Sequence, residues 1–260
     1  MRACGIGSAA ALPLLADGEA FGALNVHADE PGFFTGAVIE HLEELARGLS
    51  YGLGSLRIKA ERDQAHGALG KTLLQTVEAV ARVVEMRDPY TSGHQRRVAD
   101  LASSIAAELG LDAHRIEGVR VGALLHDIGK IAVPTEILTR PGRLSDIEYG
   151  MIKGHPQAGH DILKDVSFPW PVREMILQHH ERLDGSGYPH GLKGARIVLE
   201  ARILAVADVV EAMTTHRPYR AGLGIDKALA EIEQGQGNLY DPAAVEACLR
   251  LFREKGFHWE

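Results

Sequence analysis

The sequence predicts a mainly α-helical fold with a small α/β segment at its N-terminal end. Aromatic residues make up only 5% of the chain, and the abundance of small and aliphatic side chains favours closely packed helices. Beyond residue 87, apolar residues recur at the three- and four-residue spacing of amphipathic helices. Strand-like runs occupy residues 9–28, where two apolar segments flank an Asp-Gly turn signal.

The first 54 residues read as part of a larger α/β unit. After the hairpin, Glu-Pro-Gly at 30–32 breaks the pattern, and a helix is predicted from Thr35 to about Leu53. One hairpin and one helix are too little for an independent core. The segment resembles the C-terminal part of a GAF sensor domain through LPLLADGEAFGALNV, Phe33-Phe34 and the helix after them. The resemblance covers about half of such a domain, without its ligand-binding half, and therefore assigns no ligand.

Two further regions complete the predicted organisation. Residues 55–85 fit a connecting helix, which either pairs with a second subunit, giving a homodimer, or packs on its own domain. Residues 86–260 form the third region, in which Ser145 and Glu148 make a capping box. Its helices are predicted at about 93–109, 113–126, 145–153, 156–164, 171–181, 196–214, 225–234 and 242–254.

Charge and cysteine content exclude several classes of protein. The formal net charge of −7 argues against general nucleic-acid binding, which needs an excess of Lys and Arg. A phosphate-bearing substrate would be held locally, by metal ions and a few cations. Cys4 and Cys248 exclude a disulfide framework and a cysteine zinc site, and they fit a reducing cytoplasm. No apolar run reaches membrane-spanning length, and no signal peptide is indicated. The sequence thus predicts a cytoplasmic protein.

The thirteen histidines are the unusual feature of the composition. Several stand beside acids or at predicted helix ends, in segments far apart along the chain. These positions are His94, His126-Asp127, His155 and His179-His180. A lone His-Asp pair is most often a surface feature, so the hypothesis of a metal site depends on whether the segments converge. His160, His190 and His216 are interpreted as ordinary surface or supporting residues.

Asp208 gives the clearest physical signal. It lies within the apolar run ILAVADVV at 203–210, where a carboxylate is expected to be buried. A buried charge must be paired or bound to a metal. Two interpretations stay open at this point: a metal ligand, or a buried salt bridge with Arg202.

Three motifs carry a closer resemblance. HDIGK at 126–130, HHERLDGSGYP at 179–189 and ILAVADVVEAMTTHRPYR at 203–220 closely resemble the HD-GYP family of cyclic di-GMP phosphodiesterases. RDPYTSGHQRRV at 87–98 and Gly-His-Pro at 154–156 also match. The resemblance spans roughly residues 70–255 and implies a helical bundle of the HD superfamily.

The resemblance also implies a set of site residues. Asp127 would bridge two metals and, with Lys130, carry the catalysis. The implied metal ligands are His94, His126, Asp127, His155, His179, His180 and Asp208. The implied substrate contacts are Lys130, Gly187, Tyr188, Arg217, Arg220, Asp88 and Glu211.

Two departures from the family pattern refine these expectations. Some members hold a third metal through a Glu four residues before the first ligand histidine. Tyr90 stands there in this chain, which predicts two metals. The family often has Asp three residues after its last metal aspartate, where this chain has Glu211. The extra methylene would alter a contact with a guanine edge, so substrate preference is less fixed than hydrolysis itself.

The expected activity is metal-dependent hydrolysis of cyclic di-GMP to pGpG, which lowers the level of this second messenger. Further cleavage of pGpG to GMP is an alternative outcome. The mixed His and Asp ligands suit two divalent ions, most simply Fe or Mn, with Ni and Zn as alternatives. Such ions would supply hydroxide near neutral pH, and Lys130 would stabilise charge on the phosphoryl oxygens. Two other hypotheses remain: an HD hydrolase of another cyclic dinucleotide, and a catalytically weak cyclic di-GMP receptor.

Overall fold

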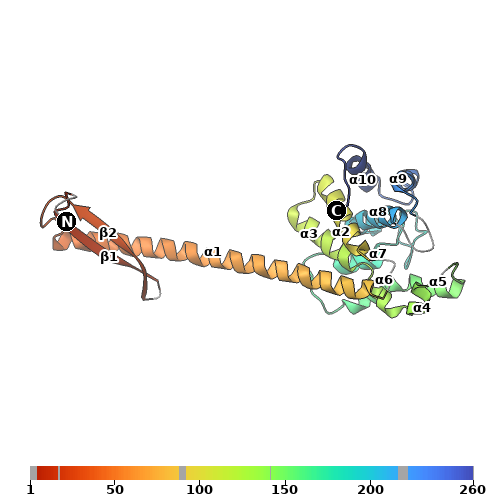
Figure 1. The fold of residues 1–260 in the computed structure, drawn as a ribbon, viewed down its shortest axis with the longest axis horizontal. Coiled ribbons are helices and arrows are strands. Elements are labelled where there is room, and N and C mark those ends of the chain that lie inside the picture. The colour runs from red at the N-terminus through yellow and green to blue at the C-terminus, as the bar shows by residue number, and fades with distance from the viewer. Residues whose placement is uncertain (1–4, 17, 88–91, 141, 216–221, 260) are drawn as a thin grey trace. The chain divides into compact units, whose positions relative to one another are not determined.

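The computed structural model describes residues 5–16, 18–87, 92–140, 142–215 and 222–259. The chain divides into two compact units, residues 1–72 and 73–260, and the division falls within helix α1 (Gly36–Glu85) (Figure 1). The two helices predicted at 35–53 and 55–85 are therefore one continuous helix. An internal glycine costs a helix only about 1 kcal/mol relative to alanine, so glycines such as Gly54 weaken α1 without ending it.

The N-terminal unit is a hairpin packed on the first turns of α1. Strands β1 (Ser8–Ala16) and β2 (Glu19–Ala28) are antiparallel, as predicted, and pair from Ser8 with Ala28 to Ala16 with Glu19. Leu12, Leu14 and Ala46 form its small buried cluster.

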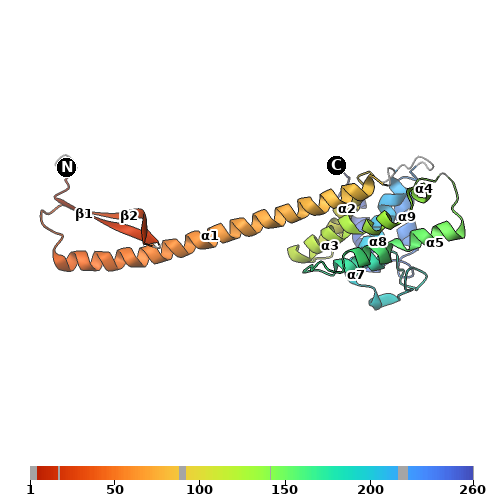
Figure 2. The same ribbon diagram turned by 90° about the horizontal axis from the view of Figure 1, so that it is seen from below.

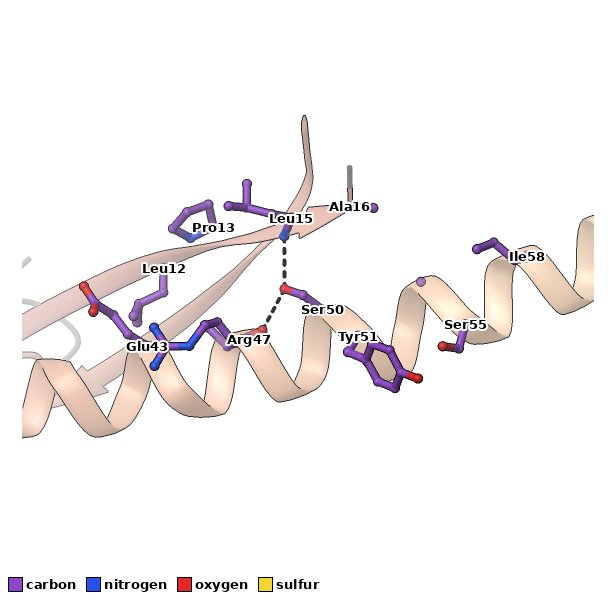
Figure 3. A pocket seen from close by; sticks show the side chains of 12 residues that line it. Leu12, Pro13, Leu15, Ala16, Glu43, Arg47, Ser50, Tyr51, Ser55 and Ile58 are labelled. Atoms are coloured by element: carbon purple, nitrogen blue, oxygen red, sulfur yellow. Dashed lines mark hydrogen bonds between the residues drawn. The ribbon is translucent and has the colours of Figure 1, made fainter. Parts of the chain in front are cut away.

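A largely apolar groove of about 580 Å³ lies between β1 and α1 of this unit. Figure 3 shows Ser50 linking the strand to the helix: its hydroxyl accepts a hydrogen bond from the Leu15 amide at 3.0 Å and donates one to the Ala46 carbonyl at 2.7 Å.

The C-terminal unit is a helical bundle, which confirms the mainly α fold class. Its longer helices are α2 (His94–Glu108), α3 (Ala113–Leu125), α5 (Asp146–Lys153), α6 (His155–Ile162), α7 (Val172–Gln178), α8 (Leu199–Thr214), α9 (Ile225–Gln234) and α10 (Pro242–Arg253). Three short elements were not predicted: η3 (Ile128–Ala132), α4 (Thr135–Leu138) and η4 (Gly194–Arg196). Among the helices described, none is long and apolar enough to cross a membrane.

Local sequence signals fix where these helices begin. The predicted capping box is present, because Ser145 and Glu148 each bond the other's backbone amide at the start of α5. Asp112 caps α3 by accepting from the Arg115 amide at 2.9 Å, and Asp241 caps α10. The helix ends near the histidine motifs are therefore set locally.

The core of this unit surrounds α2 and α8. Helix α2 packs against α3 and α8, while α6 packs against η3 and α7, and Figures 1 and 2 show these helices gathered into one body. Leu101, Ile105, Met175, Ile203 and Leu204 are fully buried. This packing brings the ends of α2, α3 and α7 and the middle of α8 to one place.

Candidate metal centre

Seven histidine and aspartate side chains from separate elements converge in the C-terminal unit. His94 begins α2, His126 and Asp127 follow α3, His155 begins α6, His179 and His180 follow α7, and Asp208 lies within α8. They form three overlapping groups: His155, His179 and His180; His94, His126 and Asp208; and His126, Asp127 and His179. Within each group the candidate ligand atoms all lie within 4.8 Å of one another. These are the positions that the sequence motifs predicted.

Asp127 stands between two sets of ligands. Its Oδ1 lies 3.4 Å from His155 Nε2. Its Oδ2 lies 3.4 Å from His126 Nε2 and 3.8 Å from His94 Nε2. The Asp127 residue is only 2% exposed. The buried carboxylate thus presents one oxygen to His155 and the other to His126 and His94.

Backbone carbonyls orient three of the imidazoles. The Nδ1 atoms of His126, His155 and His179 lie 2.7, 2.8 and 2.6 Å from the carbonyl oxygens of Ala123, Ile152 and Ile176. A carbonyl can only accept, so each Nδ1 carries the proton and each Nε2 keeps its lone pair. The lone pairs face the centre, which is the arrangement that ligand histidines adopt.

The chemistry of these donors fits bound cations. His155 Nε2 and His179 Nε2 lie 3.2 Å apart, and both nitrogens carry lone pairs when both Nδ1 atoms are protonated. Two facing lone pairs repel unless a cation lies within reach of both. Imidazole and carboxylate ligands without thiolate suit transition-metal ions. The residues at this site therefore match a divalent-metal centre.

The pKa shifts of His180, His179 and Asp127 agree with such a centre. Burial lowers the pKa of His180 to about 3, with Asp208 opposing the shift. Burial, with the neighbouring histidines, also lowers the pKa of His179. Burial opposes ionisation of Asp127, but Lys130 and three histidines hold its pKa well below the usual range. Neutral imidazoles and ionised carboxylates are the forms that bind metal.

Lys130 contacts the Asp127 carboxylate directly. Its Nζ is 2.7 Å from Asp127 Oδ2, and the lysine comes from the η3 turn just after the motif aspartate. Gly129 allows this turn to press against α6, because an added Cβ would lie 1.9 Å from the His155 carbonyl oxygen. The HDIGK motif thus positions a cation beside the centre.

Glu211 is a buried partner of His94, a role that the sequence did not suggest. It is 1% exposed, and its carboxylate bonds His94 Nδ1, Arg97 Nε at 2.7 Å and the Thr215 hydroxyl at 2.6 Å. The carboxylate therefore orients His94, and its contact with a substrate stays a prediction. Burial opposes the shift, but Asp208 and Glu211 together raise the pKa of His94 to about 9.

The geometry distinguishes between the two interpretations of Asp208, a salt bridge with Arg202 or a place among the candidate ligands. Arg202 pairs with Asp241, whereas Asp208 Oδ1 lies 3.3 Å from His94 Nε2. The Asp208 side chain is 13% exposed. Arg202 is therefore engaged elsewhere, and Asp208 belongs to the cluster.

The loop after His180 folds back over the centre. Glu181, 2% exposed, accepts hydrogen bonds from the His190 and Leu192 amides at 2.8 and 2.9 Å. Gly187 is required for space, since an added Cβ would lie 2.4 Å from the His180 carbonyl oxygen. The Tyr188 ring lies 4.7 Å from the His180 ring, centroid to centroid. Tyr188 thus lies beside a candidate ligand, and the substrate contacts of Gly187 and Tyr188 stay a prediction.

Some predicted residues lie outside the described part of the chain. These are Asp88, Tyr90, His216, Arg217 and Arg220. Of the histidines interpreted as ordinary, His160 bonds Arg173 at 3.0 Å and His190 is exposed.

The sequence did not indicate the supporting roles of Glu181 and Glu211, although both acids flank histidine or aspartate motifs. The partners of Glu181 lie in its own loop, whereas His94 lies 117 residues from Glu211, and no spacing rule would have identified either set of partners.

Comparison with known families decides the classification. The family model for the HD domain matches residues 78–244, more than half of the chain. The chain belongs to the HD domain family. The match contains all seven convergent residues, and it agrees with the HD part of the sequence resemblance. The GAF-like interpretation of residues 1–54 stays a prediction.

Several curated relatives are similar to this HD-domain chain. It is 42% identical over 178 residues to the cyclic di-GMP phosphodiesterase response regulator RpfG of Xanthomonas campestris pv. campestris, covering 68% of this chain and 47% of the relative. It is 41% identical over 197 residues to 3'3'-cGAMP-specific phosphodiesterase 3 of Vibrio cholerae, covering 74% and 43%. It is 41% identical over 184 residues to a cyclic di-GMP phosphodiesterase of Thermotoga maritima, covering 70% and 50%. The chain spans at most about half the length of these relatives.

Solved structures agree on the fold. An HDG"Y"P protein from Bdellovibrio bacteriovorus aligns with a TM-score of 0.54 at 21% identity, covering 78% of this chain and 64% of that one. A cyclic GMP-AMP-specific phosphodiesterase from V. cholerae aligns with a TM-score of 0.53 at 21% identity, covering 68% and 49%.

Proposed function

We propose that this HD-domain chain is a metal-dependent phosphodiesterase that hydrolyses cyclic di-GMP to pGpG and so lowers the level of the second messenger. One observation carries the proposal. Asp127 directs Oδ1 toward His155 and Oδ2 toward His126 and His94, which supports a site for two ions on either side of one carboxylate. Fe or Mn fits the donor set best, with Ni and Zn as alternatives.

The proposed roles of the chain's own groups follow from their positions. Divalent ions, when bound, activate water and neutralise charge on a phosphate. Lys130, which lies on Asp127, stabilises charge on the phosphoryl oxygens. Glu211 holds His94 in one tautomer, and Glu181 fixes the loop that carries Tyr188 beside His180. Arg217 and Arg220 are proposed as further phosphate contacts by their motif alone.

A second candidate substrate has specific support. Relatives named as acting on cyclic di-GMP and on 3'3'-cGAMP match this chain at 42% and 41% identity. Similarity at that level does not separate the two dinucleotides. Comparing kcat/KM for both with one purified preparation decides between them. A receptor that binds without turnover is disfavoured, because all seven candidate ligand positions carry ligand side chains.

The function is tested on protein purified without oxygen, with metal analysis and chromatography of the products. We expect about two metal ions per chain and conversion of cyclic di-GMP to pGpG. Asp127→Ala should lose metal and activity together. Hydrolysis that survives complete metal loss would contradict the proposed chemistry.

Two further proposals concern the oligomeric state and the cellular location of the protein. Exposed apolar residues on α1, among them Leu56, Ile58 and Leu69, support a homodimer through residues 55–85. Light scattering of Leu56→Glu and Leu69→Glu variants tests it, and an unchanged mass contradicts it. A cytoplasmic location is supported by the free, buried thiol of Cys248.

A further inference from the structure

Beside the metal centre lies a lysine that none of the motifs includes. Lys153 is the last residue of α5, and Gly154 alone separates it from His155 at the start of α6. Its Nζ lies 4.7 Å from the centroid of the Tyr149 ring and 5.4 Å from that of Tyr188. The ammonium is thus held near two aromatic rings, one of them on the loop that covers the centre.

Lys153 has no counter-ion within the described part of the chain. The side chain is half-buried, and among the described residues no carboxylate forms an ion pair with its ammonium. Glu148, on the same helix, is engaged by Arg140 and Ser145. A half-buried cation in this setting is available to an anion, and two tyrosine rings stabilise it without neutralising it.

The position of Lys153 differs from that of Lys130. Lys130 lies on Asp127, whereas Lys153 lies 5.4 Å from the centroid of the Tyr188 ring, and that ring in turn lies 4.7 Å from the His180 ring. A phosphate held at the metals would meet Lys130. A second phosphate of the same molecule, on the Tyr188 side of the centre, would meet Lys153.

We propose that Lys153, held by Tyr149 and Tyr188, binds the phosphate of the cyclic dinucleotide that is not being cleaved. The inference rests on the proposed function, because only a substrate with two phosphodiesters offers that second anion. It adds a specificity-determining residue to the site. A substrate with a single phosphodiester would gain nothing from this lysine.

The chemistry predicts a defined kinetic pattern. Lysine binds phosphate as a point charge, and removing one charge-assisted hydrogen bond to the substrate raises KM by about tenfold. Lys153→Met should therefore raise KM for cyclic di-GMP about tenfold with little change in kcat. Turnover of bis(4-nitrophenyl) phosphate, a diester with one phosphate, should be unchanged, and so should metal content.

Matched variants separate this role from a structural one. Lys153→Arg should recover most of the affinity, because it restores the charge. Tyr149→Leu should raise KM for cyclic di-GMP by a smaller factor, because the ammonium is less well held. Lys227→Met, an exposed lysine on α9, should leave both substrates unaffected. The salt dependence of KM should also be shallower in Lys153→Met than in the wild type.

Binding of cyclic di-GMP, measured by calorimetry alongside turnover, keeps the two proposals separable. A wild type that binds the dinucleotide without cleaving it contradicts the proposed function, and a weaker Kd for Lys153→Met would still support the inference. An unchanged KM and Kd in Lys153→Met overturn the inference while the function stands. Equal reductions in turnover of both substrates, with metal released, also overturn it, because Lys153 would then act through His155. A wild type that binds no cyclic dinucleotide overturns both.

Discussion

Replacing Glu211 by glutamine is expected to weaken metal binding on the His94 side of the centre by about 10- to 100-fold, the usual cost of removing an outer partner of a ligand histidine. The structure gives the reason. One carboxylate serves His94 Nδ1, Arg97 Nε and the Thr215 hydroxyl, all of which are donors. A glutamine amide has one oxygen and one NH₂, so its NH₂ must face at least one of these donor groups.

The substitution is expected to change the tautomer of His94. If the amide oxygen stays with Arg97 and Thr215, its NH₂ faces His94. The imidazole then accepts through Nδ1 and carries its proton on Nε2, where a metal needs a lone pair. The decrease in affinity corresponds to about 1.4–2.8 kcal/mol. Titration with Mn²⁺ against a competing chelator, followed by metal analysis, measures it, and stoichiometry should fall toward one ion per chain.

Glu200→Gln is the matched control for this experiment. Glu200 is also on α8, is 8% exposed, and accepts from Arg115 at 2.6 Å, away from the candidate ligands. We expect the substitution to lower the free energy of unfolding while sparing metal binding. If Glu211→Gln keeps full metal affinity and loses only as much stability as Glu200→Gln, the tautomer argument is refuted.

Three other substitutions or reactions test separate parts of the structure. Asp127→Ala should reduce metal content and cyclic di-GMP turnover together, with a loss of at least about a thousandfold in kcat/KM. The proposed ions would lose their shared ligand, and a catalytic metal contributes several kcal/mol of transition-state stabilisation. Metal analysis and product chromatography check this. Gly129→Ala should lower the free energy of unfolding in urea by about 1–3 kcal/mol, since its Cβ would meet a backbone oxygen of α6 at 1.9 Å. Gly150→Ala, whose Cβ would meet none of the described atoms within 4 Å, should instead raise it by up to about 1 kcal/mol. In a Cys4→Ser background, Cys248 should resist iodoacetamide at pH 8, because burial raises the pKa of its thiol to about 12 and only the thiolate reacts.

Each of these has a contrary result. Retained activity in a metal-free Asp127→Ala protein would remove Asp127 from the chemistry. Equal stability of the two glycine variants would show that the turn after the motif relaxes at little cost. Rapid alkylation of Cys248 without denaturant would mean that α10 opens readily, whereas reaction only in urea would support the buried position.

Much of the fold follows from local signals. The helix from Ile225 to Gln234 matches its prediction, and others differ by one to three residues at their ends, because amphipathic spacing and caps are local properties of the chain. The break expected near residue 54 was wrong, since glycines alone do not end a helix. The four-residue α4 and the η turns are too short to show a period.

For the candidate site too, the sequence predicted the residues that lie in motifs but not the contacts between distant segments. Candidate ligand histidines such as His126 and His179 fall in motifs, and the sequence predicted that they would lie together. The role of Glu211 was not predicted, because its partner His94 lies 117 residues earlier in the chain and only tertiary packing brings them together. Lys153 was missed for the same reason, since its ring partner Tyr188 belongs to a distant loop.

The carbonyl bonds to His126, His155 and His179 have a consequence for how such proteins diverge. Each ligand ring takes its orientation from the main chain of its own helix turn, and no neighbouring side chain has to be retained for that purpose. Side chains around these three rings are then free to change while the rings keep their orientation. A single scaffold can in this way be retuned from one cyclic dinucleotide to another by substitutions around these rings, without altering how the main chain holds them.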